Sequence, residues 1–392
     1  MLLTIITFII VLSILVFAHE LGHFMMARKF GVKAEEFGFG FPPRAFGFYK
    51  NNQGRWKIVW GAKEVSDCPG TVYSINWLPL GGFVKIKGEN GLAADSSQED
   101  NRDSFFSRPI WQRAFMLSAG VVMNIILAAV LITVGFMIGL PQALDGQIDA
   151  RAHLSDKKIQ IIQVIKNTPA EAAGLQIGDA ILSIDNNNFL NYQELQNYVA
   201  ANIGHKLSYK IKRGQNLTEA SIIPELMPET NRGGIGIAIS ETGIVSYPWY
   251  LAVWHGVKTT LILTWAIIIA FYELIKGLIL GHGVTADLSG PVGIATLTGQ
   301  IARLGFVYLL QFTALLSINL AVINFLPIPA LDGGRVLFLI IEKIKRSPVK
   351  SEVEGAIHNI GFALLMILIL LVTFRDVSRF GGVFKNILEK IF

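Results

Sequence analysis

Charged residues are scarce in this chain of 392 residues, where they make up 16% of the sequence against about 25% in an average soluble domain. Together with 52% hydrophobic residues and a mean hydropathy of +0.48, this composition excludes a wholly soluble globular protein. The apolar residues gather in runs long enough to cross a bilayer, separated by segments of ordinary soluble composition. We therefore expect a polytopic α-helical membrane protein with water-soluble parts.

Cysteine is nearly absent, because Cys68 is the single one. One cysteine cannot form a disulfide within the chain or build a thiolate metal site, so we interpret it as structural. The 34 Lys and Arg residues outnumber the 29 Asp and Glu residues and give a net charge of +5. Because these basic residues flank the apolar runs and do not form one patch, they indicate no nucleic-acid partner.

Four apolar runs are long enough to span a membrane as helices. The first carries no charge before His19; a cleaved signal peptide, the alternative for this run, would begin with basic residues. A fifth run, 251–280, has charged interruptions and a short clean core, so we expect an interfacial amphipathic helix within 248–304, with a fifth span as the alternative. The four expected spans are residues 1–30, 111–140, 305–334 and 357–375.

Basic loops predict how the spans are oriented, since short loops rich in Lys and Arg stay cytoplasmic. The segment from Arg28 to Arg108, which covers most of the region 31–110, holds 12 basic and nine acidic residues, and the loop 335–356 is also basic. With both on the cytoplasmic side, the N-terminus and the segment after 140 lie outside. A fifth span would place the 335–356 loop on the wrong side. The remaining residues, 376–392, are expected to be a C-terminal tail.

Residues 150–228 have soluble composition and resemble a bacterial PDZ domain. The resemblance rests on Thr168-Pro-Ala, Ala173-Gly-Leu and Gly178-Asp-Ala-Ile. Pro169 is expected to open a short helix, Gly174 to end it, and Gly178-Asp179 to turn into a strand. PDZ domains bind an extended peptide or a chain terminus at a sheet edge. The alternative is a module that limits access by its bulk alone.

The sequence His19-Glu20-Leu21-Gly22-His23 carries the chemistry. Two His residues at i and i+4 share one helix face, where they can bind Zn²⁺, and the Glu between them is placed to act as a base toward water. A catalytic zinc needs a third protein ligand, for which Asp332 is the best candidate. The predicted topology brings it to the depth of His19 and His23. The alternatives are a helix end whose polar groups reach the interface, and a simple turn at Asp332 before Gly-Gly.

These motifs together resemble the site-2 protease family of intramembrane zinc metalloproteases. The resemblance includes Asn324-Phe-Leu-Pro-Ile-Pro-Ala-Leu-Asp-Gly-Gly and the segment 73–89. It implies that Zn²⁺ is held by His19, His23 and Asp332 with Glu20 as the catalytic base. It further implies that 73–88 forms a membrane-associated β-hairpin whose edge pairs with an unwound substrate; a surface hairpin without that role is the alternative. The substrate-binding residues it implies are Asn319, Asn324, Gly81 and Gly82.

The implied function is a zinc endopeptidase of the bacterial cytoplasmic membrane. It would cleave single-span proteins already trimmed outside, such as anti-sigma factors, or signal-peptide remnants. Two rivals are a non-catalytic PDZ adaptor with a structural zinc and an integral protease acting on soluble tails. Glu20 argues against the first, because a structural site needs no base; the depth of Asp332 and the Asn pair in a span argue against the second. The family's most studied bacterial members have two PDZ domains, whereas this chain has room for one.

Overall fold

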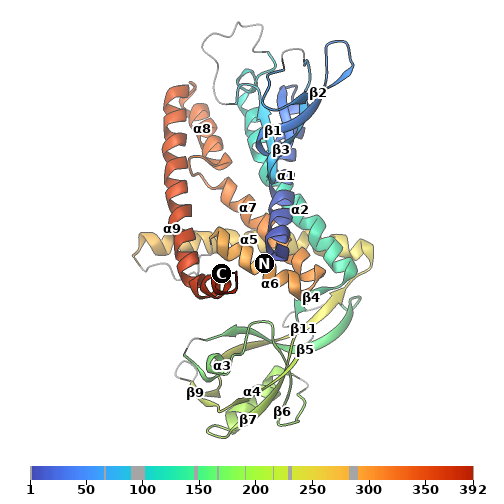
Figure 1. Cartoon of the computed structure of the whole chain (residues 1–392), viewed down its shortest axis with the longest axis vertical. Helices are drawn as coiled ribbons and strands as arrows, with labels where there is room; N and C mark the ends of the chain where they lie inside the picture. Colours follow the sequence, from blue (N-terminus) through green and yellow to red (C-terminus); the bar gives the residue numbers. More distant parts are fainter. Residues whose placement is uncertain are drawn as a thin grey trace. The chain divides into compact units, whose positions relative to one another are not determined.

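The computed structural model describes residues 2–391 except 66–67, 90–101, 145–148, 166, 190, 215, 228–231 and 282–289. It consists of two compact units (Figure 1). The first unit contains Met1–Ile132, Gly256–Ala302 and Leu309–Phe392, and the second contains Thr133–His255 and Arg303–Tyr308. Each unit is described by itself.

Five helices in the described part of the chain are long and apolar enough to cross a membrane. They are α1 (Leu2–Lys29), α2 (Ile110–Ile138), α5 (Trp249–Ile279), α7 (Phe306–Phe325) and α9 (Ser351–Ile391). Four of them coincide with the four expected spans. The fifth, α5, has the length and composition of a span although we expected an interfacial helix, and none of its most apolar window is buried in the protein. Its interfacial position stays a prediction.

Two shorter α-helices lie directly before and after α7 in the sequence. Helix α6 (Pro291–Leu304) precedes α7, and α8 (Asp332–Lys345) occupies much of the expected cytoplasmic loop. Helix α9 continues to Ile391, so the residues expected to form a separate tail are helical. A Pro-rich segment separates α7 from α8. Proline interrupts a helix because it lacks the N–H that a helix interior needs.

Helices α1 and α2 cross at very close range. A Cβ added to Gly22 of α1 would lie 2.3 Å from the carbonyl oxygen of Ala119 in α2. Only glycine, which has no Cβ, allows the two backbones to come this close. The crossing therefore buries the face of α1 that carries His19 and His23, each 7% exposed.

A three-stranded antiparallel sheet, ordered β2-β1-β3, follows α1. Its strands are β1 (Ala34–Lys50), β2 (Trp56–Trp60) and β3 (Val72–Ile86). Both β1 and β3 bend back on themselves, so Phe37 lies opposite both Tyr73 and Val84. Where we expected one hairpin over residues 73–88, two bent strands interleave. Gly81, with φ of +94°, lies at the bend of β3.

The second half of β3 forms the edge of this sheet next to α1. It pairs with β1 through Gly82, Val84 and Ile86, and no other described strand pairs with it. Ser13 of α1 fixes the bend, since its hydroxyl donates to the carbonyl of Pro79 and accepts from the N–H of Gly81. The edge segment thus has one set of backbone groups free for another strand.

The second unit contains the PDZ domain, a six-stranded sheet ordered β4-β11-β5-β6-β7-β8. The expected motif is confirmed locally: Pro169 begins α3, Gly174 follows it with φ of +74°, and Gly178 precedes β6. The sheet extends past the expected boundaries of 150 and 228, because β4 and β11 pair with each other and β11 pairs with β5. The elements are β4 (Leu140–Ala143), β5 (His153–Val164), α3 (Pro169–Ala172), β6 (Ala180–Ile184), α4 (Tyr192–Ala201), β7 (Leu207–Arg213), β8 (Asn216–Ile222), a separate pair β9 (Glu225–Met227) and β10 (Arg232–Gly234), and β11 (Ile237–Ser246).

Candidate metal centre

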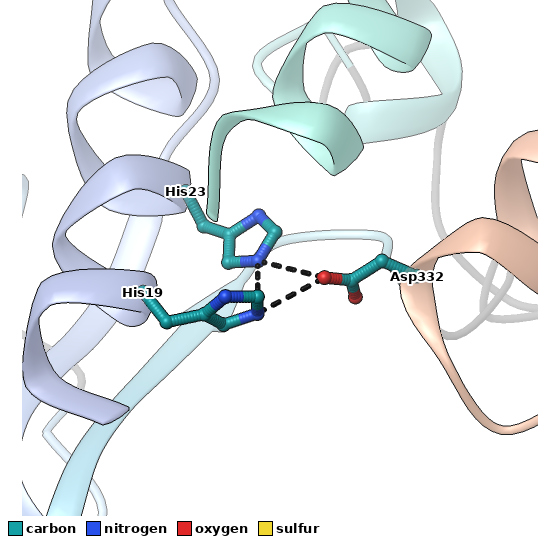
Figure 2. A group of neighbouring side chains, drawn as sticks. All are labelled: His19, His23 and Asp332. Carbon is teal, nitrogen blue, oxygen red and sulfur yellow. Dashed lines mark hydrogen bonds and ion pairs between the residues drawn. The ribbon is translucent and has the colours of Figure 1, made fainter. Parts of the chain in front are cut away.

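Three side chains from two distant parts of the chain converge in the first unit (Figure 2). His19 and His23 lie one turn apart on α1, and Asp332 points at them from the first residue of α8. The Asp332 Oδ2 is 3.0 Å from the Nε2 of His19 and 3.3 Å from the Nε2 of His23. The two Nε2 atoms are 3.2 Å apart. The structure therefore brings the three predicted ligands together.

These spacings fit a tetrahedral zinc ion. Bonds of about 2.0–2.1 Å in a tetrahedral site separate neighbouring ligand atoms by roughly 3.3 Å. The two Nε2 atoms and the Asp332 Oδ2 form a triangle whose sides are close to that length. The donor set of two imidazoles and one carboxylate is that of catalytic zinc sites that keep a fourth position open. The site thus fits Zn²⁺ in spacing and in chemistry.

Contacts with α2 fix the ring orientations of both His residues. The Nδ1 of His23 lies 2.9 Å from the backbone carbonyl of Met116, so this nitrogen carries the proton and Nε2 has a free lone pair. The Nδ1 of His19 lies 3.3 Å from the side-chain nitrogen Nδ2 of Asn124. A ring N–H that donates to the protein, as that of His23 does, orients a metal-binding imidazole and raises its basicity.

Asn124 was not predicted as a site residue. It is fully buried, and Ser317 of α7 donates to its backbone carbonyl. Binding of a metal through Nε2 requires a proton on the Nδ1 of His19, so the amide oxygen of Asn124 has to face the ring in the metal-bound protein. The one signal in the sequence is that Asn124 is the only amide in the apolar run from Ala114 to Leu140.

Asp332 is presented by a segment with unusual backbone demands. A Cβ on Gly333 or Gly334 would lie 2.3 Å from a carbonyl oxygen of Phe325 or Ile328 respectively, which explains both glycines. The Oδ2 of Asp332 lies within hydrogen-bonding distance of the Nε2 atoms of both His19 and His23. To bind a metal, this carboxylate has to be ionised.

Two ion pairs hold α8 against neighbouring elements, and neither pair was predicted from the sequence. Arg113 of α2 makes a two-pronged contact with Glu342, at 2.5 and 3.1 Å. Arg335, one turn after Asp332, pairs with Glu89 beyond the end of β3. Pairs between residues more than 200 positions apart leave no local pattern in the sequence. They connect the Asp332 helix to the elements that flank α1.

A cavity of about 390 Å³ opens beside the three ligands. Glu20 lines it next to His19 and His23. The edge of β3 forms a second wall, where a Cβ on Gly82 would lie 3.2 Å from the Cβ of Glu20. The segment before Asp332 and the residues His358, Asn359 and Phe362 of α9 line it as well. The base, the metal ligands and a strand edge thus share one space.

Not every predicted substrate residue lies at this cavity. Gly82 lines it, while Gly81 lies against Val16 of α1. Asn319 donates to the carbonyl of Leu315 in its own helix, and neither it nor Asn324 lines the cavity. A substrate role for Asn319 and Asn324 stays a prediction.

Comparisons with known proteins give the family of this chain. The model of peptidase family M50 matches residues 7–61 and 63–368. The regulator of sigma-W protease RasP of Bacillus subtilis is 32% identical, with 96% of this chain and 98% of the relative covered. The zinc metalloprotease RasP of Geobacillus kaustophilus is 31% identical over 96% and 98%. A solved PDZ domain of an SdrC-like protein from Listeria innocua is 31% identical, covers 21% of this chain and 92% of that one, and has a TM-score of 0.20.

Membrane-spanning helices and a His-Glu-x-x-His centre completed by an aspartate define a membrane metallopeptidase with an inserted PDZ domain. Within that class, the chain belongs to peptidase family M50, whose model covers most of its length.

Proposed function

We propose that this chain is a zinc-dependent endopeptidase that cleaves single-span membrane proteins within the plane of the bacterial cytoplasmic membrane. The observation that carries the proposal is the position of Glu20, which shares one cavity with the metal-ligand triangle and the β3 edge. The names of the relatives, a regulator of sigma-W protease and a zinc metalloprotease, agree with it. Anti-sigma factors trimmed outside and signal-peptide remnants are the substrate classes.

Each site residue has a defined task. His19, His23 and Asp332 hold the zinc ion, which when bound supplies a Lewis acid for a peptide carbonyl and lowers the pKa of water. Glu20 takes a proton from the attacking water and returns it to the leaving amine. Helices α1 and α2 bury the metal ligands and shield them from lipid and bulk water.

The free edge of β3 gives the substrate a way to bind. A transmembrane helix has to unwind before a peptide carbonyl is accessible, and the unwound segment needs new partners for its backbone groups. The segment Gly82–Ile86 offers them by strand addition beside Glu20. Asn319 and Asn324 are candidates for additional contacts along α7.

The basic loops support a proposal for sidedness. Because loops rich in Lys and Arg stay cytoplasmic, the basic residues of α8 and of the region between α1 and α2 favour a metal centre toward the cytoplasm and a PDZ domain outside. The PDZ domain then binds a newly exposed chain terminus or excludes untrimmed ectodomains by size.

The test uses the full-length protein with a model single-span substrate. Glu20→Gln is expected to abolish cleavage with zinc still bound, and Asp332→Ala is expected to lose zinc as well. Glu273→Gln, at an exposed carboxylate on α5, is the matched control and should cleave normally. Unchanged cleavage by Glu20→Gln would contradict the assigned base. A wild-type protein that binds zinc without cleaving would support the adaptor function instead.

A further inference from the structure

Two residues on one face of α9 hold the segment that carries Asp332. The Nδ1 of His358 accepts a hydrogen bond from the backbone N–H of Ala330 at 2.8 Å. One turn later, a Cβ on Gly361 would lie 2.4 Å from the Cβ of Pro329. Since residues at i and i+3 lie on the same side of a helix, α9 contacts two consecutive residues directly before the metal ligand.

Ala330 has a conformation that needs such a contact. Its φ of +79° falls in the left-handed region, which is strained for a residue other than glycine and persists only where surrounding contacts enforce it. Ala330 lies between the end of α7 at Phe325 and the start of α8 at Asp332. The bond to His358 therefore fixes a peptide group that neither helix fixes.

The ring of His358 is itself held in place. It packs against Phe338 of α8, with the ring centroids 5.4 Å apart. Because Nδ1 accepts from Ala330, the neutral ring carries its proton on Nε2, and Glu354 lies 4.0 Å from that atom. His358 lines the cavity but is not one of the three clustered ligands. Its contacts join α9, the segment before Asp332 and α8.

We infer that His358 is a positioning residue of the metal centre, which acts through Ala330 to aim the Asp332 carboxylate at His19 and His23. The inference rests on the proposed function, in which Asp332 binds zinc. Residues that orient metal ligands change metal affinity by roughly 10–100-fold when they are replaced. His358 acts on the backbone two residues before the ligand, so the lower part of that range is expected.

Zinc affinity of the full-length protein, measured by competition with a chromophoric chelator, tests the inference without relying on activity. His358→Phe keeps a ring for Phe338 but removes the acceptor, and it should weaken zinc binding by roughly 10-fold. His358→Asn places its amide oxygen near the position of Nδ1, and it should bind zinc nearly as tightly as the unaltered protein. His205→Phe, at an exposed His of the PDZ domain, is the matched control and should have no effect.

A second variant tests the same contact in case His358→Phe does not fold. Gly361→Ala leaves His358 in place but pushes on Pro329, and it should also weaken zinc binding. Asp332→Ala, measured in parallel, tests the zinc site itself. If this variant keeps wild-type affinity, the proposed site is wrong. If Asp332→Ala loses zinc while His358→Phe does not, or if His358→Asn is as weak as His358→Phe, the positioning role of His358 is overturned and the site stands.

Discussion

Gly120 of α2 lies directly against the His23 imidazole, so that a Cβ added at Gly120 would be 2.4 Å from the His23 Nε2 and 2.6 Å from the His19 Cε1. The two rings therefore occupy space that any side chain at position 120 would need. This contact gives the metal centre a wall on the side of α2.

Gly120→Ala is expected to displace one or both imidazoles and to lower zinc affinity strongly, by roughly 10-fold or more. The helix itself should tolerate the change, since alanine favours helices over glycine by about 1 kcal/mol. Zinc content after dialysis against a chelator checks this prediction, with Gly355→Ala as the control because nothing lies within 4 Å of a Cβ there. A Gly120→Ala protein with unchanged zinc retention would show that the rings have room to move.

Asn124 gives a second prediction. Asn124→Leu removes the amide whose oxygen has to face the protonated Nδ1 of His19 in the metal-bound protein, and zinc affinity should fall by roughly 10–100-fold. Asn124→Asp retains an acceptor at the same distance and should keep most of the affinity. Chelator competition compares the two variants. Equal losses would mean that Asn124 contributes through packing between α1, α2 and α7 and not through its hydrogen bond.

Sequence reasoning predicted the ligands because their signals are local. His19 and His23 are one helical turn apart, and Asp332 follows a distinctive Pro-rich stretch. Asn124 acts across 105 positions, and only the packing of α2 on α1 reveals its partner. The same holds for His358, which contacts Ala330 from a different helix.

The fold shows the same division between local and long-range features. The turn chemistry around Gly174 and Gly178 predicted the start of the PDZ motif, and the structure confirms it. The last strand of that sheet, β11, pairs with β5 more than 70 residues earlier, and it lies beyond the expected boundary at residue 228. The interleaving of β1 and β3 also depends on long-range pairing, and the sequence around Gly81 indicated only the bend.

Arg213 and Asp179 provide a prediction for the PDZ domain. Asp179 is 1% exposed and accepts from the Nε and Nη2 of Arg213, both at 2.7 Å, and from the N–H of Gln176 at 2.8 Å. Arg213→Ala leaves a buried carboxylate with fewer donors, which should destabilise the domain by about 1–3 kcal/mol. Hydrogen exchange along β6 and β7 measures the change. Lys212→Ala, at the exposed neighbouring position, should leave exchange unaltered, and equal effects of both variants would refute the assigned role of the ion pair.

Glu36 and Arg44 give a pH prediction for the bent strand β1. Arg44 donates from Nε and Nη2 to the two carboxylate oxygens of Glu36 at 3.0 and 2.6 Å, joining the two halves of the strand. Burial alone would raise the pKa of Glu36, but the hydrogen bonds from Arg44 outweigh it and lower that pKa below the usual value. A lowered folded-state pKa means that the pair stabilises the sheet above the unfolded pKa of about 4.3 and loses this contribution as the pH falls through the folded value.

Protection of β1 amides against hydrogen exchange should therefore be full near neutral pH and should decline in the acid range, after correction for the intrinsic pH dependence of exchange. Glu36→Gln removes the charge at every pH, so its corrected protection should be lower at neutral pH and should lack the acid-range decline. Glu35→Gln is the matched control, because Glu35 pairs with the well-exposed Lys85 and exposed pairs contribute little. If Glu36→Gln retains the decline, another carboxylate controls the acid sensitivity of the strand.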